Sequence, residues 1–431
     1  MNRSFYTIMA AQFFSSLADN ALLIAAIALL TQLSGPAWMT PLLKFFFTVS
    51  YVVLAPFVGA FADAIRKGHV MFSTNAVKII GCLLMLFYEF MPVPGLPGYA
   101  TVLLAYAVVG LGAAGYSPAK YGILTELLPP RQLVLANGWI EGLTVISIIL
   151  GVLLGGALVS PTVSAALLAF DVPHYETCID TPAEAAILVI AFLYVIAAIF
   201  NLFIPDTGAR YRPQHTSPVL LVCDFWTCFT TLWRDKLGQV TLAVTTLFWG
   251  AGATLQFLVL RWAERHLGLP LSQGAILQGV TAVGIAIGAV LAARYVPLKK
   301  SLSVLPVGVA MGGAVMLMAL VSAMPLVYLL LILVGALAGF FVVPMNALLQ
   351  HRGHVLLSAG HSIAVQNFNE NISILVMLAL YSVMIATRLP VHTITVMFGL
   401  FVAITMLGVI LLHRHNQRKE DSLHLIGAEK P

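Results

Sequence analysis

Charged residues are scarce in this chain of 431 residues. Only 9% of its residues are Asp, Glu, Lys or Arg, whereas 60% are hydrophobic, and the formal net charge is +5. Such a composition argues against a soluble enzyme. We attribute the modest positive charge to contacts with membrane lipids rather than to nucleic acid, so no nucleic-acid partner is expected.

Segments of alternating polarity, which an outer-membrane barrel would need, are also lacking. Instead, apolar runs of about twenty residues recur along the chain, and the mean hydropathy is +0.97. These properties predict an all-α polytopic membrane protein. The apolar run after Arg3 is too long for a signal peptide and has no small-residue cleavage site, so we expect it to be a permanent first span.

Motifs of metal binding and catalysis are missing as well. The four cysteines, Cys82, Cys178, Cys223 and Cys228, form no C-x-x-C pair and no metal-type spacing with histidine. The chain has no H-x-x-x-x-D, H-E-x-x-H or G-x-S-x-G sequence. His361 looks like the only embedded histidine, and no acid stands near it. We therefore expect no catalytic residue, metal or cofactor, and a membrane-embedded acyltransferase is a disfavoured alternative.

Twelve membrane spans are predicted from the apolar runs. They start near residues 5, 40, 70, 99, 134, 183, 239, 272, 301, 326, 358 and 391. The longest polar stretch between spans divides them into two sets of six. We predict an N-terminal six-helix half over 1–205, a cytoplasmic linker over 206–238, a C-terminal six-helix half over 239–413 and a cytoplasmic tail over 414–431.

Basic residues indicate the orientation of these spans. The connections that share a face with both termini hold most of the Lys and Arg, among them Arg66, Lys67 and Arg131, whereas the opposite face keeps only Arg265 and Arg388. Because positive charge is retained on the cytoplasmic side, both termini are predicted to be cytoplasmic.

The two halves resemble each other, and one connection carries a known motif. Residues 117–124, which contain the proline near the end of span 4, parallel residues 343–349 at the end of span 10. Between spans 2 and 3, residues 59–68 read GAFADAIRKG, which resembles the G-x-x-x-D-x-x-[RK]-x-G signature of the major facilitator superfamily. The resemblance implies the major facilitator fold, with Gly59, Asp63 and Arg66 as a conformational latch. An ordinary charged turn remains the alternative for the motif alone.

Polar side chains form stripes on three spans at the spacing i, i+3, i+4, i+7. The first stripe contains Gln12, Ser15, Ser16 and Asp19; the second, in span 5, contains Asn137, Glu141 and Thr144; the third, in span 11, contains Gln366, Asn369, Glu370 and Ser373. A carboxylate at the centre of a membrane helix costs roughly 2.5–3.5 kcal/mol, which favours a functional role for Asp19 and Glu370. The stripes are expected to converge on one cavity. Lys44 and Lys78 are expected to snorkel or to pair locally.

Three longer stretches indicate a particular family within this superfamily. They are residues 18–23 (ADNALL), 116–124 (YSPAKYGIL) and 340–350 (FFVVPMNALLQ). Together they resemble the bacterial lysophospholipid transporter family. The resemblance implies a flippase that moves lysophosphatidylethanolamine and lysophosphatidylglycerol across the inner membrane to the cytoplasmic leaflet, by alternating access with a lateral opening for the acyl chain. Since the chain ends at Pro431, the reacylating acyltransferase is expected to be a separate partner, and the transporter a monomer.

The stripes and motifs supply the candidate substrate-binding residues, which are Asp19, Asn20, Lys120, Asn137, Glu141, Gln256, Arg261, Asn346, Gln366, Asn367 and Glu370. Carboxylates are expected to hold a headgroup ammonium, and amides to bond phosphate or glycerol oxygens. Phe45, Phe46, Phe47, Phe248, Phe257 and Phe341 are candidates for contact with the acyl tail.

Three questions stay open at this stage. Relatives tend to carry a basic residue where this chain has Gln256, so either Arg261 or Lys120 would meet the phosphate. An ion pair between Lys120 and Glu141 is as plausible as substrate contact. A proton-coupled exporter of amphipathic drugs, which would use Asp19 or Glu370 as its protonation switch, is the alternative function.

Overall fold

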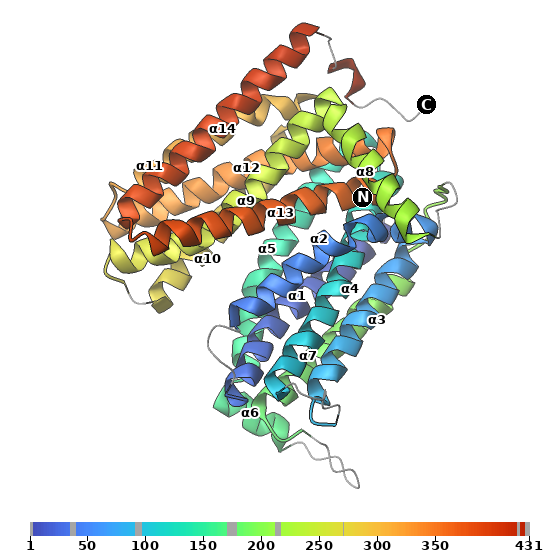
Figure 1. Cartoon of the computed structure of the whole chain (residues 1–431), viewed down its shortest axis with the longest axis vertical. Helices are drawn as coiled ribbons and strands as arrows, with labels where there is room; N and C mark the ends of the chain where they lie inside the picture. Colours follow the sequence, from blue (N-terminus) through green and yellow to red (C-terminus); the bar gives the residue numbers. More distant parts are fainter. Residues whose placement is uncertain are drawn as a thin grey trace. The chain divides into compact units, whose positions relative to one another are not determined.

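The computed structural model describes residues 3–34, 40–90, 97–169, 179–211, 217–269, 271–419 and 423–426. These residues form fourteen α-helices and three short 3₁₀ turns, with no strand among them (Figure 1). The helices are α1 Arg3–Gln32, α2 Thr40–Ala64, α3 Lys67–Leu86, α4 Gly98–Leu127, α5 Leu133–Leu158, α6 Pro161–Leu168, α7 Pro182–Leu202, α8 Pro218–Arg234, α9 Lys236–Arg265, α10 Leu271–Tyr295, α11 Leu305–Leu317, α12 Met324–Leu356, α13 Ala359–Ala386 and α14 Val391–Lys419.

Twelve membrane spans are found in the described part of the chain, which confirms the predicted number and their starting points. Each is a helix long and apolar enough to cross a bilayer; the ninth joins the 3₁₀ turn Leu298–Val304 to α11. The protein is therefore a multi-pass membrane protein. Prolines lie inside α4 (Pro118) and α12 (Pro344), at the matching positions that the sequence comparison of the halves indicated.

Two helices were not predicted. The short helix α6 follows α5, and the 17-residue α8 lies inside the segment predicted as a polar linker. The linker contains charged residues, but its apolar side chains recur at helical spacing, and Phe225 and Leu232 are buried. Residues 212–216 of the linker, and residues 420–422 and 427–431 of the predicted tail, lie outside the described residues.

The chain packs as two compact units. The first comprises residues 1–120 with 146–218, and the second comprises residues 121–145 with 219–431. The boundaries fall inside α4 and α5 rather than only at the linker. The division into halves at residues 205 and 239 stays a prediction.

Small residues let helices approach closely inside each unit. In the first unit, a Cβ at Gly155 of α5 would lie 2.7 Å from the carbonyl oxygen of Ala21 in α1. In the second unit, α10 and α12 pack through Gly284, Gly288 and Gly339, where a Cβ would collide with a backbone carbonyl of the facing helix. These glycines thus set the contact distance between the helices that they join.

Candidate functional site

In the first unit, Asp19 of α1 forms an ion pair with Lys78 of α3. Lys78 Nζ lies 2.8 Å from Asp19 Oδ1 and 2.9 Å from Oδ2, and it also donates to Ser15 Oγ at 3.1 Å. The Tyr194 hydroxyl of α7 donates to Asp19 Oδ1 at 2.6 Å. The Lys78 side chain is 1% exposed and that of Asp19 is 22% exposed. The carboxylate is thus compensated inside the protein, while part of it stays accessible.

The expectation that Lys78 snorkels or pairs locally is wrong, because its partner lies 59 residues away on another helix. The Lys78 ammonium also stands over the rings of Tyr116 and Tyr194, 5.1 and 5.3 Å from their centroids. Gly112 of α4 leaves room for this side chain, since a Cβ there would lie 2.7 Å from Lys78 Cγ. Aromatic faces and a carboxylate are both partners that attract an ammonium group.

Ser15 of the α1 stripe is buried, and the neighbouring Asn20 is half-buried. Ser15 donates to Asn75 Oδ1 of α3 at 2.9 Å, and Asn20 donates to the Ser16 carbonyl of its own helix at 2.8 Å. Among the described residues, the buried Tyr116 hydroxyl and Asn75 Nδ2 have no hydrogen-bond partner. This cluster therefore keeps two polar atoms that a ligand or water can satisfy.

In the second unit, a chain of hydrogen bonds links α5, α12 and α13. Asn346 Nδ2 donates to Glu141 Oε1 at 3.3 Å, Gln366 Nε2 donates to Asn346 Oδ1 at 3.2 Å and to Glu370 Oε1 at 2.7 Å. All four side chains are buried. Gln366 Oε1 has no partner in the described part of the chain. The structure brings Glu141, Gln366 and Glu370 of the stripes in spans 5 and 11 together through Asn346, and the predicted common cavity stays a prediction.

Asn137 lies one helical turn before Glu141 and makes a reciprocal amide pair with Gln350 of α12. Each side-chain amide donates to the carbonyl oxygen of the other at 2.9 Å. Both residues are fully buried. Two matched amides satisfy each other without water, so this pair fastens α5 to α12 beside the carboxylate chain.

The rest of the span 11 stripe is used for packing. Asn369 Oδ1 accepts from Trp233 Nε1 of α8 at 3.3 Å, and Ser373 meets Gly250 of α9. The expectation that all four residues of this stripe face one cavity is therefore wrong. On a helix, positions three apart differ by about 60° in direction, enough for Asn369 to point at a different neighbour from Gln366.

Aromatic side chains pack α8 against α13. Phe225, Trp226 and Phe229 surround Phe368, with ring centroids 5.3, 6.0 and 6.1 Å away. At the end of α8, Asp235 forms a bidentate ion pair with Arg352 of α12, at 3.0 and 2.6 Å. The α8 helix, which makes up most of the predicted linker, is thus held in the second unit by these contacts.

The remaining candidate residues have these positions. Lys120 lies half-buried on α4, Arg261 is half-buried on α9, Gln256 is exposed on α9, and Asn367 is buried on α13. The Gln256 carbonyl accepts from Gln278 at 2.7 Å. The cation that would meet a phosphate stays a prediction.

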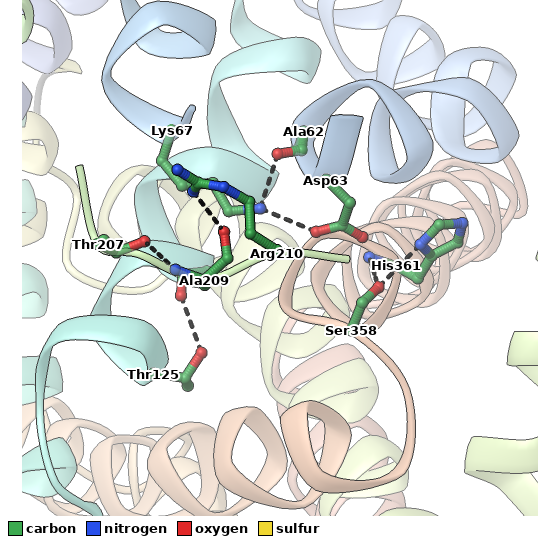
Figure 2. A network of polar contacts seen from close by, with 10 residues as sticks. Ala62, Asp63, Lys67, Thr125, Thr207, Ala209, Arg210, Ser358 and His361 are labelled. Carbon is green, nitrogen blue, oxygen red and sulfur yellow. Dashed lines mark hydrogen bonds and ion pairs between the residues drawn. The ribbon is translucent and has the colours of Figure 1, made fainter. Parts of the chain in front are cut away.

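The motif at residues 59–68 forms a compact polar network in the first unit. In Figure 2, dashed lines join the Lys67 ammonium to Ala62 and Asp63; its Nζ donates to the Ala62 carbonyl at 2.7 Å and to Asp63 Oδ1 at 2.8 Å. Arg66 instead lies 3.0 Å from Asp206. Hydrogen bonds from Arg210 and from the Gly208 amide, together with the charges of Arg210 and Arg66, lower the pKa of Asp206 well below its usual range.

Comparison with known proteins decides the family. A model of the Major Facilitator Superfamily matches residues 8–377. Relatives from Yersinia enterocolitica and Yersinia pestis, both named lysophospholipid transporter LplT, are each 43% identical over 392 residues, 91% of this chain and 89% of theirs. The chain belongs to the lysophospholipid transporter family of the major facilitator superfamily.

Solved transporters share its fold. The human organic anion transporter MFSD10 matches with a TM-score of 0.69 at 15% identity, covering 94% of this chain and 100% of the other. The Escherichia coli fucose:proton symporter FucP matches with a TM-score of 0.72 at 14% identity, covering 95% and 99%. These structures confirm the predicted major facilitator fold, and at such identities nothing more.

Sequence reasoning missed several members of the buried polar clusters of this chain. Four residues that contact a predicted site residue, or the residue next to one, were not among the candidates. They are Lys78 and Tyr194, which bind Asp19, Gln350, which binds Asn137, and Trp233, which binds Asn369 beside Glu370. A lysine in the middle of an apolar run is a signal that could have been used for Lys78. His361 is also not the only embedded histidine, since His351 is 4% exposed.

Proposed function

We propose that this protein carries lysophosphatidylethanolamine and lysophosphatidylglycerol across the bacterial inner membrane to the cytoplasmic leaflet. The observation that carries the proposal is its 43% identity to the LplT transporters over 91% of the chain. In this proposal both termini are cytoplasmic, the protein acts as a monomer without catalysing a reaction, and a separate acyltransferase consumes the product. The carrier works by alternating access, with a lateral opening for the acyl chain.

The headgroup is proposed to bind at the chain of Glu141, Asn346, Gln366 and Glu370. Two carboxylates bridged by amides form an acidic site that suits a primary ammonium. Gln366 Oε1, which lacks a partner among the described residues, supplies a further acceptor for an ammonium proton. The buried amides Asn137, Asn346 and Asn367 are proposed to serve phosphate or glycerol oxygens, and Lys120 or Arg261 to supply the cation.

Asp19 and Asn20 are proposed to form a second contact region. Lys78 is buried and pairs with Asp19, whose side chain is 22% exposed, so only the accessible edge of the carboxylate meets a headgroup. The ion pair offsets the cost of burying Asp19, so its burial has a structural explanation besides binding.

The acyl tail is proposed to contact phenylalanines that the protein leaves accessible. Phe45 and Phe257 are 46% and 40% exposed, whereas Phe341 is 1% exposed. Phe341 is therefore withdrawn as a tail contact, since it packs in the core against the Gly308 position. Gly59, Asp63 and Arg66 are proposed to act in the conformational latch, with Lys67 holding Asp63 in place.

Transport into proteoliposomes tests the headgroup assignment. Lysophosphatidylethanolamine carries an ammonium and lysophosphatidylglycerol does not. Glu370→Gln should therefore lower uptake of the first about tenfold or more, as expected for loss of a charged hydrogen bond of about 1.5–3 kcal/mol, and affect the second much less. Glu264→Gln, an exposed carboxylate on α9, is the matched control. Equal uptake of both lipids by Glu370→Gln and the wild type would remove the ammonium role.

The same vesicles separate this function from drug export. Uptake of lysophosphatidylethanolamine that persists after collapse of the proton gradient supports the lipid carrier. Absence of any lysophospholipid uptake, together with gradient-driven export of amphipathic cations, would establish the alternative.

A further inference from the structure

Two histidines meet at one end of the second unit, away from the polar chain. His266 follows directly after α9 and His392 lies in the first turn of α14. His266 Nδ1 lies 3.3 Å from His392 Nε2, and the rings are perpendicular, with centroids 4.5 Å apart. Neither residue has a place in the proposed transport cycle.

The tautomer of His266 follows from its other nitrogen. Nε2 lies 3.1 Å from the carbonyl oxygen of Val321 and 3.1 Å from Ser322 Oγ. A carbonyl oxygen only accepts, so the tautomer with the hydrogen on Nε2 satisfies Val321, and in that tautomer Nδ1, which lies 3.3 Å from His392 Nε2, keeps its lone pair. A histidine that donates its second N–H to a backbone carbonyl is the usual arrangement for a metal ligand.

The distance between the two facing nitrogens fits a shared metal ion. Two imidazole nitrogens that bind Zn²⁺ at about 2.0–2.1 Å with tetrahedral angles lie about 3.3 Å apart. When His392 carries its hydrogen on Nδ1, both facing nitrogens offer lone pairs to one point. His266 stands at the end of α9 and His392 at the start of α14, and the contacts with Val321 and Ser322 hold the His266 ring in place.

We propose that His266 and His392 form a two-histidine site for a borderline divalent metal ion such as Zn²⁺ or Cu²⁺. These ions favour imidazole ligands. No third His, Cys, Asp or Glu gathers with the pair in the described residues, so water completes the coordination shell. The bound metal links the end of α9 to the start of α14.

Trp262 provides a built-in reporter. Its ring stacks on His266, with centroids 5.7 Å apart and planes 24° apart, and its Nε1 donates to the Met318 carbonyl at 2.9 Å. Cu²⁺ bound to His266 is therefore expected to quench Trp262 fluorescence.

The decisive variant is His392→Asn in the full chain, purified without a histidine tag. The asparagine amide can still donate to His266 Nδ1, so the helix contact is kept while the second imidazole is lost. Zn²⁺ titration by calorimetry should give one strong site in the wild type, weakened about tenfold or more in His392→Asn. Zn²⁺ should raise the melting temperature of the wild type and not that of the variant, and Cu²⁺ should quench less in the variant.

His69→Ala is the matched control, because His69 is an exposed histidine of the first unit, and it should bind Zn²⁺ like the wild type. His266→Ala removes the other ligand and serves should His392→Asn fail to fold. Zn²⁺ binding by His392→Asn or His266→Ala as strong as by the wild type, or no binding by the wild type, would overturn the metal site and leave a hydrogen-bonded pair.

Discussion

Lys78 Nζ of α3 lies 2.8 and 2.9 Å from the two carboxylate oxygens of Asp19 in α1, and thereby holds two membrane helices together through one buried ion pair. In the apolar interior of the first unit, each of the two charges is compensated by the other. Breaking a buried pair leaves one uncompensated charge, which costs more than replacing both partners by neutral groups.

Replacing Lys78 alone should therefore destabilise the first unit strongly. For Lys78→Met we expect a loss of about 3–5 kcal/mol, seen as a lower melting temperature in detergent. The double variant Asp19→Asn/Lys78→Met removes both charges and should recover much of that loss. If the double variant were as unstable as the sum of the single variants, the pair would not be energetically coupled.

Gly112 should be sensitive to the addition of one methyl group. In Gly112→Ala the new Cβ would lie 2.7 Å from Lys78 Cγ and 2.7 Å from the Thr74 carbonyl, and we expect a loss of about 1–3 kcal/mol from overpacking. Gly156→Ala is the control, because a Cβ there has no atom within 4 Å; it should be neutral or more stable by about 0.5–1 kcal/mol. Thermal unfolding of both variants measures the difference, and equal melting temperatures would contradict this explanation.

The hydrogen bond from Trp233 should fasten α8 to α13. Trp233→Phe keeps an aromatic ring but leaves the buried Asn369 Oδ1 without this donor, so stability should fall by about 1–3 kcal/mol. Proteolysis of the segment before α9 should become faster in the variant. Trp226→Phe is a suitable control, because the Trp226 side chain packs against Phe229 and Phe368 through ring contacts; identical protection in both variants would mean that the Trp233 hydrogen bond does not hold α8.

Asp235 has two separable roles at the start of α9. Its Oδ2 accepts from the Gly238 amide at 2.8 Å as an N-cap, and both oxygens bind Arg352. Asp235→Asn keeps the cap but loses the ion pair, whereas Asp235→Ala loses both and should be less stable by a further amount of about 1 kcal/mol. Melting temperatures in the order wild type, Asn, Ala are expected; equal values for Asn and Ala would show that the cap contributes nothing.

The sequence was sufficient for the membrane architecture because that property is local. A bilayer requires about twenty consecutive apolar residues per helix, so the runs themselves predicted all twelve spans and their starts. The family also followed from short contiguous stretches such as residues 116–124 and 340–350. The α8 helix was not predicted, because it is amphipathic and its apolar face packs against Phe368 of α13, a helix far away in the sequence.

The candidate site was predicted in part. Helical spacing placed Gln366 and Glu370 on one face, and the structure joins them to Glu141 through Asn346. Helical spacing alone does not predict that Asn369 accepts a hydrogen bond from Trp233, because the position of a neighbouring helix is a property of the tertiary structure.

The amino-acid sequence by itself determined that this chain crosses the membrane repeatedly and which residues are too polar to be there without a partner, because hydropathy and helical period are read along one segment. Only the tertiary structure decided the partners: Lys78 for Asp19, Gln350 for Asn137, Asn346 between two carboxylates. A partner is chosen by which helices pack together, and residues 59 or 213 positions apart become neighbours only when the chain has folded.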